Sequence, residues 1–333
     1  AMVAPTPISA YLHSATMVKA GVYLVARFGP AFANDPVWRP LVISIGAVTM
    51  VLGGLRALRQ HDLKLLLAFG TVSQLGLLFV LFGAGYEGAA LAGVLMLLAH
   101  ALFKAALFMV VGIIDHQTGT RDLRAVPGLG RKWLPVIASG VIVAASMAGV
   151  PSEFGFVAKE QAFAAFDDVR GTWVWATLVL AVLVAGSCVT VAYTVRWAWG
   201  AFTSGGTDWH PAPPPADVSR PPGWSFWGPP AVLAAATLVL GLVPALFDDL
   251  ADAALGSLVA EAHEPHLAVW HGLTVEVWLS ILVYAVGAAM FLARRPVARW
   301  LAHGRVIPSG SDVYLAVLRG LNHLADRFTP LVQ

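Results

Sequence analysis

The chain has 333 residues, of which 58% are hydrophobic and 12% are charged, and its mean hydropathy is +0.74. Soluble proteins carry charge on about a quarter of their residues, so this composition predicts a polytopic membrane protein. The net charge of +2, with no basic patch or stripe, excludes a nucleic-acid binder, and the single cysteine, Cys188, excludes an internal disulfide or a thiolate metal cluster.

Eight apolar windows are long enough for a helix that crosses a bilayer, which needs about 20 residues. The windows are continuous and rich in Leu and Ala, unlike the short alternating strands of a membrane barrel. We therefore predict an all-α polytopic membrane protein with about eight transmembrane helices, one of them broken. The predicted spans are residues 8–27, 41–58, 63–83, 88–114, 133–165 with a break inside, 173–198, 229–247 and 269–293.

The charges between these windows predict the orientation of the chain, because Lys and Arg collect on the cytoplasmic side of a membrane. Basic residues cluster in 56–64, 121–132 and 294–305, and acidic residues in the opposite loops. With eight spans, the basic segments all lie on one side. The sequence thus predicts a multi-pass protein of the cell membrane whose two ends are cytoplasmic. The chain enters a span within ten residues without a cleavable-signal layout, so we interpret it as the middle of a longer polypeptide.

Two segments are predicted not to span the membrane. Residues 201–228 contain six prolines between positions 211 and 222, which predicts an extended cytoplasmic connector. Two further helices follow in 229–293. Within a cytoplasmic segment, 294–333, the apolar residues of 311–327 recur at helical spacing with polar residues between them, which predicts an amphipathic helix along the membrane or another helix.

The fourth window carries two ionisable residues near the middle of the bilayer. Lys104 is too far from either end of its window to reach the interface, and His100 lies one turn earlier on the same face. Ionisable groups at this depth are costly, and they usually belong to an ion or proton path. The pair could share a proton or a water chain, or it could only hold helices together.

The fifth window is interrupted at residues 149–155 by one proline and two glycines, which predicts a discontinuous helix. Lys159 lies on the second half-helix, and broken helices beside charged groups are typical of transporter sites. We predict that Lys159 is a protonatable gate, with Glu153 and Glu160 as possible partners. The alternative is an interfacial turn from which Lys159 reaches the membrane surface.

The first and third windows contain three weaker candidates. His13 and Lys19 are six residues apart, about 240° around a helix, so they should contact different neighbours. Lys19 is central enough to be functional, whereas His13 could equally be a packing residue. Lys64 follows Asp62 at a helix start, where an interfacial anchor explains it as well as a proton relay does.

Four stretches together resemble the antiporter-like subunits shared by Mrp sodium/proton antiporters and respiratory complex I. They are PTPISAYLHSATMVKAG (5–21), DLKLLLAFGTVSQLG (62–76), HALFK (100–104) and GFVAKE (155–160). Lys19 and the tail from Tyr314 look most like the large A-type subunit of the Mrp antiporters, because the complex I homologue commonly lacks a lysine at that place.

The resemblance implies a fold of fourteen core helices with two inverted five-helix repeats, each containing one broken helix. Residues 1–200 would form the C-terminal part of the proton-translocating module, with the second repeat at about 41–198. Lys159 would be the terminal proton-accepting lysine, and His100 with Lys104 the central relay. His13 and Lys19 would connect this relay toward the first half-channel, with Lys64 as a further element. Complex I members often carry a second histidine where this chain has Met96, so the relay would be shorter here or filled by water.

We therefore expect a fragment of a transporter subunit rather than an enzyme, moving protons through a midplane Lys/His relay coupled to sodium efflux. The transported ions would be Na⁺ and H⁺, without a cofactor, and the sequence identifies no cation site. The partners would be other small membrane subunits, one of them a homologous antiporter-like protein. As an alternative, a proton-pumping complex I subunit would share these residues without sodium coupling. A membrane enzyme is disfavoured because no nucleophile–base pair appears at depth, and a structural scaffold would tolerate loss of the lysines.

Overall fold

The computed structural model describes residues 5–32, 35–126, 128–171, 174–203, 216–259, 267, 272–296, 314–323 and 325. The chain forms two units, Ala1–Arg294 and Arg295–Gln333. Within the described part of the first unit, regular structure is helical except for one antiparallel bridge between Asp62 and Asp122. In the second unit, residues 314–323 are helical with mostly exposed side chains. The predicted all-α class is confirmed.

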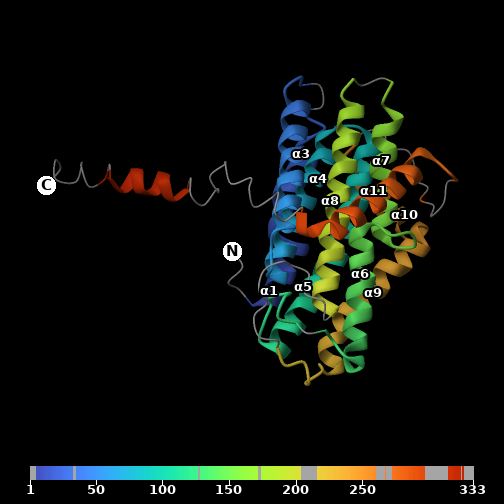
Figure 1. Ribbon diagram of the computed structural model, residues 1–333. Helices are drawn as coiled ribbons and strands as arrows, with labels where there is room; N and C mark the ends of the chain where they lie inside the picture. Colours follow the sequence, from blue (N-terminus) through green and yellow to red (C-terminus); the bar gives the residue numbers. More distant parts are fainter. Residues whose placement is uncertain are drawn as a thin grey trace. The chain divides into compact units, whose positions relative to one another are not determined.

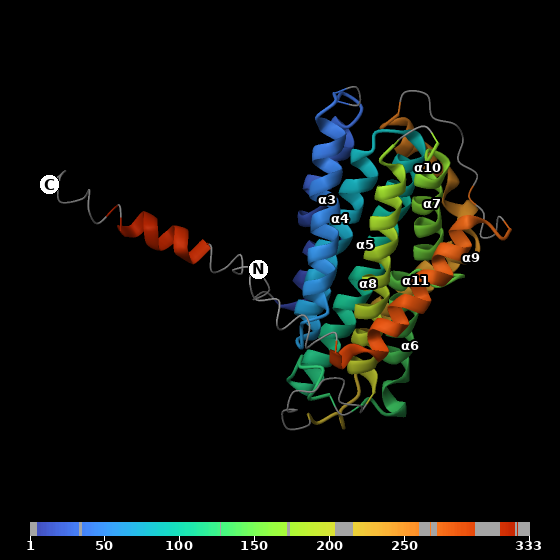
Figure 2. The same cartoon turned by 45° about the horizontal axis from the view of Figure 1, so that its top comes forward.

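Most of the longer α-helices of the first unit run along a bundle, and α11 crosses the others obliquely (Figures 1 and 2). The α-helices of this unit are α1 (Thr6–Ser14), α2 (Ala20–Phe28), α3 (Trp38–Ala57), α4 (Leu63–Gly83), α5 (Glu87–Thr118), α6 (Leu134–Ala148), α7 (Phe154–Asp168), α8 (Ala176–Phe202), α9 (Trp224–Leu242), α10 (Asp248–Gly256) and α11 (Val275–Leu292). Short 3₁₀ turns occur at η1 (Met17–Lys19), η2 (Arg131–Trp133) and η3 (Pro244–Phe247).

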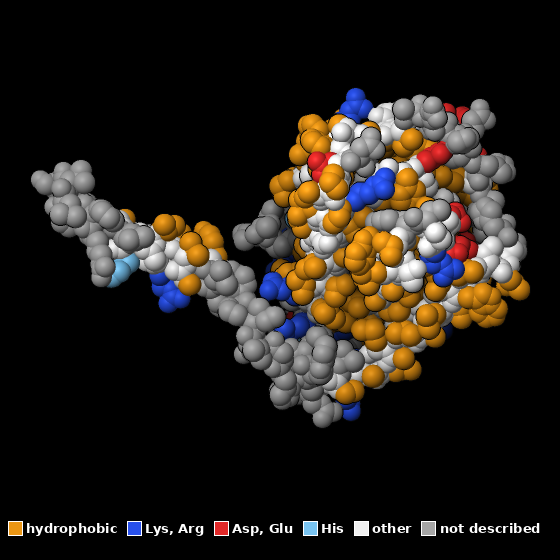
Figure 3. Space-filling model, turned by 90° about the horizontal axis from the view of Figure 1, so that it is seen from above, with side chains coloured by type: hydrophobic (Ala, Val, Ile, Leu, Met, Phe, Trp, Pro, Cys, Tyr) orange, Lys and Arg blue, Asp and Glu red, His pale blue; other side chains and the backbone are white. Residues whose placement is uncertain are grey.

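Seven segments of the described chain are long and apolar enough to cross a membrane: α3, α4, α5, η2 with α6, α8, α9 and α11. Most residues in the apolar windows of the central helices α4, α5 and α8 are buried, whereas only 22% of the residues in those of α9 and α11 are buried. Apolar side chains such as Val232 and Trp278 therefore face outward. Viewed from one end, hydrophobic side chains line the flank of the bundle (Figure 3). Such a surface suits contact with lipid.

The predicted break in the fifth span is present. Helix α6 ends at Ala148 and α7 begins at Phe154, and the two halves follow one another along the bundle (Figures 1 and 2). Gly149 ends α6 in the left-handed conformation, with φ +80°, where glycine avoids the strain that a side chain would meet.

The first predicted span is also broken, which the sequence did not predict. Helix α1 ends at Ser14 and α2 starts at Ala20, with η1 between them. The hydroxyl of Ser14 donates to Ala10 O, and that of Thr16 donates to Tyr11 O at 3.4 Å. These hydroxyls bind carbonyl oxygens near the end of α1. Such side-chain hydrogen bonds compete with the backbone hydrogen bonds that would continue the helix. Counted with this broken pair, the seven segments agree with the expected eight spans.

The predicted extended connector, residues 201–228, was too long at both ends, because α8 continues to Phe202. Residues 204–215 lie outside the described residues, and 216–223 are not helical, but α9 already begins at Trp224. Pro229 and Pro230 lie inside this helix, only five residues after its start. The two prolines lack backbone N–H donors. They therefore leave carbonyls unpaired only in the first turn of α9, where the start of the helix is partly exposed. The acidic loop after η3 contains the short helix α10, which the sequence also did not predict.

Helix α5 is the centre of the bundle and packs against α1, α4, α6, α7, α9 and α10. At one end of the bundle, backbone hydrogen bonds join Leu63 N to Arg121 O at 2.8 Å and Ala216 N to Ala125 O at 2.9 Å. We call this the Arg121 end (residues 57–63, 119–133 and 216–223). At the Asp168 end (residues 84–87 and 165–171), the Tyr86 hydroxyl donates to Ala165 O at 2.8 Å. Two of the basic segments, 56–64 and 121–132, thus lie at the same end of the bundle, as expected if basic segments share one side of a membrane.

Helices α3 and α4 pack closely at glycines. A Cβ atom built on Gly76 would overlap the backbone atoms Met50 N and Gly46 O. Side chains can move aside, but a packed backbone cannot do so without shifting a helix. Small residues commonly allow such close helix contacts in membranes.

We predict that Gly76→Ala separates α3 from α4 and destabilises the fold by about 1–3 kcal/mol, as overpacking does. Gly228→Ala is the matched control, because it lies within α9 with no atom near the added methyl group. Thermal unfolding of the detergent-solubilised protein checks both changes. Equal melting temperatures for wild type and Gly76→Ala would contradict the close packing.

Candidate functional site

Four lysines are buried in the described part of the bundle, and three of them lie away from its ends. Lys19, Lys104 and Lys159 expose 8%, 0% and 5% of their surface. Each ammonium group donates to backbone carbonyl oxygens, and none of the three takes part in an ion pair among the described residues. Buried charges in proteins are usually paired. Amines held only by neutral acceptors at this depth are therefore the first sign of a functional site.

Lys159 lies on the second half of the broken span and reaches back to the first. Its Nζ atom donates to Ala148 O at 2.6 Å and to Met147 O at 3.1 Å. The last carbonyls of a helix have no intrahelical partner, and they lie at the negative end of the helix dipole. The ammonium group of Lys159 thus caps α6. The interfacial alternative is disfavoured, because this side chain is buried.

Neither predicted partner of Lys159 forms an ion pair with it in the described structure. Glu153 is buried at the N-cap position of α7, and its Oε2 atom has no hydrogen-bond partner among the described residues. Glu160 is half-buried next to Lys159 in the chain and interacts electrostatically with Tyr284 and Glu276. Their part in a relay stays a prediction.

Lys104 lies at the contact of α5 with α4 and α8. Its Nζ atom donates to Leu67 O at 3.3 Å, and this carbonyl also accepts from the Thr71 hydroxyl at 2.9 Å. The ammonium group lies 5.9 Å from the centre of the Tyr193 ring, within cation–π range. A Cβ on Gly70 would lie 3.0 Å from Lys104 Nζ, so the glycine leaves room for the amine.

His100 is fully buried one turn before Lys104 on α5. Its ring packs edge-on against Phe103, with centroids 5.5 Å apart. Neither ring nitrogen has a hydrogen-bond partner among the described residues. Buried polar groups are nearly always satisfied, and internal water commonly supplies the missing partner. His100 interacts electrostatically with both Lys19 and Lys104, so the structure brings these three predicted residues together.

Lys19 ends the 3₁₀ turn that interrupts the first span. Its Nζ atom donates to Leu97 O of α5 at 2.7 Å, one turn before His100. His13 lies on α1 before the break, and its ring lies 5.8 Å from that of Phe108. The sequence predicted that the two residues face different sides, whereas both contact α5, at positions about three turns apart.

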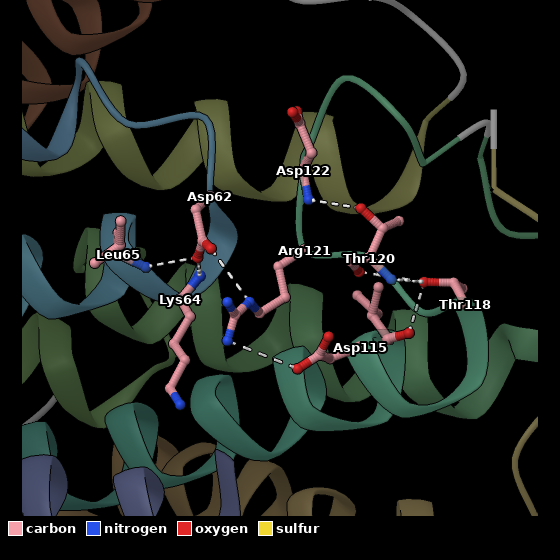
Figure 4. Close-up of polar contacts among 9 residues, drawn as sticks. Asp62, Lys64, Leu65, Asp115, Thr118, Thr120, Arg121 and Asp122 are labelled. Atoms are coloured by element: carbon pink, nitrogen blue, oxygen red, sulfur yellow. Dashed lines mark hydrogen bonds and ion pairs between the residues drawn. The ribbon is translucent and has the colours of Figure 1, made fainter. Parts of the chain in front are cut away.

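Lys64 lies in the first turn of α4 at the Arg121 end, and only 1% of it is exposed. This burial disfavours an exposed interfacial anchor. Asp62 caps α4 by accepting from Lys64 N at 2.8 Å and from Leu65 N at 2.9 Å. Figure 4 shows the Lys64 side chain running away from the Asp62 carboxylate. Lys64 also interacts electrostatically with His13, so these two predicted residues form a second group.

Charged side chains surround this entrance. The Nε atom of Arg121 lies 3.2 Å from Asp62 Oδ2, and its Nη1 atom lies 3.9 Å from Asp115 Oδ2 (Figure 4). In the same loop, hydrogen bonds from Arg124 hold the pKa of Asp122 below its ordinary value. Their contact therefore persists at neutral pH, and it is lost as pH falls through that lowered pKa.

Several polar residues of the site were not among the predicted relay residues. Tyr193 beside Lys104, Thr237 near the break and Tyr284 on α11 come from helices distant in the sequence. Gln74 of α4 donates to Thr190 of α8 at 3.4 Å. A lone hydroxyl in an apolar run is the one sequence signal that could have singled out Tyr193 and Tyr284.

The bundle and its buried amines define a polytopic membrane protein with ionisable groups in its interior. Residues 1–185 match the transmembrane family described as NADH:quinone oxidoreductase/Mrp antiporter, and the chain belongs to this family. The resemblance inferred from the sequence is thereby confirmed.

Relatives of this chain include antiporter subunits. It is 40% identical over 302 residues to a probable K⁺/H⁺ antiporter A/B subunit of Rhizobium meliloti, covering 89% of this chain and 29% of the relative. It is 35% identical over 332 residues to the Na⁺/H⁺ antiporter A subunit of Bacillus subtilis, covering 93% and 41%. The chain thus spans well under half the length of these relatives.

Solved structures share the fold. The chain resembles one chain of the Mrp complex from Dietzia sp. DQ12-45-1b with a TM-score of 0.89 and 37% identity, covering 100% of this chain and 35% of that one. Respiratory complex I from Thermus thermophilus contains a chain with a TM-score of 0.61 and 22% identity, covering 77% and 52%. The second likeness supports the fold alone.

We predict that Gly149→Ala damages both the fold and the site. Alanine at φ +80° costs about 1–2 kcal/mol, and its Cβ would lie 2.6 Å from Lys159 Cδ. The melting temperature should therefore fall. Gly119→Ala is the matched control, since Gly119 also has a positive φ, +69°, but no atom near the added methyl group. If both variants lose equal stability, the contact with Lys159 contributes nothing.

Proposed function

We propose that this chain is part of the A-type subunit of a multisubunit cation/proton antiporter in the cell membrane, and that it moves protons through a Lys/His relay coupled to sodium efflux. The observation that carries the proposal is the set of three buried lysines bound to backbone carbonyls along one bundle. The relatives named as antiporter subunits support the class. The coupled cation, the partner subunits and the relay belong to the proposal.

The proposed relay follows α5. Lys19, His100 and Lys104 form its middle part, Lys159 at the broken helix forms one end, and His13 with Lys64 leads toward the Arg121 end. Burial disfavours the charged form of an amine, so the charge of each lysine responds to its neighbours. A neutral carbonyl holds an ammonium group less strongly than a carboxylate would. A lysine held in this way can release its proton without separating an ion pair.

Helix α8 borders both the middle and the end of the relay. Tyr193 lies against Lys104, and Cys188 interacts electrostatically with Lys159. The two nitrogens of His100, which lack hydrogen-bond partners in the described part of the chain, provide sites for internal water. Water between these groups would complete the connection from Lys104 to Lys159.

The partners we propose are small membrane subunits, one of them a homologous antiporter-like protein. The oxygen ligands that a sodium ion prefers do not form an identified site among the described residues. The relatives that are 35% and 40% identical are named as antiporter subunits, which favours antiport over redox-driven pumping.

We predict that Lys104→Ala and Lys159→Ala each lower cation-dependent proton exchange by about 100-fold or more, because a proton-transfer residue contributes about that much. The measurement is dissipation of a pH gradient in vesicles that carry the whole complex, normalised to assembled complex. Lys132→Ala, at an exposed lysine of η2, is the matched control and should exchange normally. Full exchange by both buried-lysine variants would favour a structural scaffold instead.

We predict that the same vesicles exchange protons when Na⁺ is added and not when monovalent cation is omitted. K⁺ should be tested in parallel, because one relative is named for K⁺ and another for Na⁺. Proton movement that does not depend on any added cation would contradict antiport and favour the complex I type of function.

A further inference from the structure

We propose that Thr237 of α9 and Tyr284 of α11 latch the break between α6 and α7, and that this latch positions the ammonium group of Lys159. The inference rests on the proposed function of Lys159. Both latch residues lie beyond residue 185, where the match to the family ends. They would be positioning residues for the relay rather than members of it.

Tyr284 and Lys159 both lie against Gly149. The Tyr284 hydroxyl donates to Gly149 O, while the Lys159 side chain fills the space that a Cβ on Gly149 would take. Lys159 Nζ donates hydrogen bonds to the carbonyl oxygens of the two residues that precede Gly149, Met147 and Ala148. With its oxygen bound to α11, the Gly149 peptide cannot rotate freely, so Tyr284 sets the position of this carbonyl relative to the ammonium group. Tyr284 thus constrains the backbone next to the carbonyls that Lys159 meets.

Thr237 holds the break from another helix. Its hydroxyl lies 2.7 Å from the Ser146 hydroxyl, and Ser146 Oγ accepts from Gly155 N of α7 at 3.2 Å. Ser146 thus joins the end of α6 directly to the start of α7, and the Thr237 hydroxyl ties this contact to α9. The three groups are buried, so breaking either hydrogen bond would leave a polar group without a partner.

Each latch residue has a close-packed glycine one turn later on its helix. A Cβ on Gly241 of α9 would overlap the backbone of Ser152 and Glu153 inside the break. A Cβ on Gly287 of α11 would lie 2.6 Å from Val191 Cβ of α8. These close contacts hold α9 and α11 at fixed distances. The geometry therefore aims the two hydroxyls at the break, and Ser152 is kept there at an unfavourable φ of +75°.

The test compares proton exchange by wild type, Tyr284→Phe and Thr237→Val in vesicles that carry the whole complex. Each change removes one hydroxyl and keeps nearly the same volume. We expect the maximal exchange rate per assembled complex to fall about five- to tenfold in each variant, the effect of one lost hydrogen bond in a low-dielectric site. The cation concentration at half-maximal rate should stay unchanged, because neither hydroxyl binds the cation.

Tyr23→Phe is the matched control, because it removes a tyrosine hydroxyl from an exposed side chain of α2 and should leave the rate unchanged. A merely structural latch predicts less assembled complex, or a lower melting temperature, with a normal rate per assembled complex, and this result would overturn the proposal. If Tyr284→Phe does not assemble, Thr237→Val decides between the two outcomes by the same rate.

The result separates this inference from the proposed function. If Lys159→Ala abolishes exchange while Tyr284→Phe and Thr237→Val exchange at the wild-type rate, only the latch is wrong. If Lys159→Ala itself exchanges normally, the proposed function of Lys159 fails first.

Discussion

The requirement to satisfy the ammonium groups in its interior shapes this bundle. Lys19, Lys104 and Lys159 all donate to backbone carbonyls. In a regular helix these oxygens already accept from the next turn, so a buried amine needs either a helix end or a carbonyl that accepts twice. The break after α6 supplies free carbonyls to Lys159. Leu67 O, which accepts from both Thr71 and Lys104, illustrates the second solution.

Helix α5 gives these groups a common axis. Its 32 residues extend over about 48 Å at the helical rise, enough to pass through a bilayer and beyond. In order along this helix lie the carbonyl that binds Lys19, then His100, Lys104, the Phe108 ring beside His13, and finally Asp115 at the Arg121 end. Because α5 is surrounded by other helices, the ionisable groups on it can avoid lipid. A membrane protein can hold a polar interior only with such a shielded helix.

The sequence was most informative where a single apolar window contained both an unfavourable feature, such as a buried charge or a helix break, and the residues that reveal it. Proline and two glycines within an apolar run predicted the break at 149–155, and His100 with Lys104 were identified by their distance from both ends of a span. The break at Ala15–Lys19 was missed because it depends on hydroxyls that compete for backbone carbonyls, which apolar periodicity does not register. Tyr193, Thr237 and Tyr284 could not be assigned to the site, because helix-to-helix contacts between distant segments are set by packing. The start of α9 was placed too late because prolines were read as incompatible with helix, whereas the first turns of an exposed helix tolerate them.

Within the described structure, Lys19, Lys104 and Lys159 donate hydrogen bonds to carbonyls and to no carboxylate. This choice of acceptor bears directly on how such a site could work. An ion pair inside a low-dielectric interior is costly to separate, and each partner would be left as an isolated charge. A carbonyl dipole stabilises an ammonium group enough to keep it buried, but it loses little when the amine becomes neutral. The buried carboxylate of Glu153 forms no ion pair with Lys159 among the described contacts, although it lies at the same break. A bundle that separates its buried amines from its buried acids therefore keeps the amines easier to discharge, and the proposed relay requires that property.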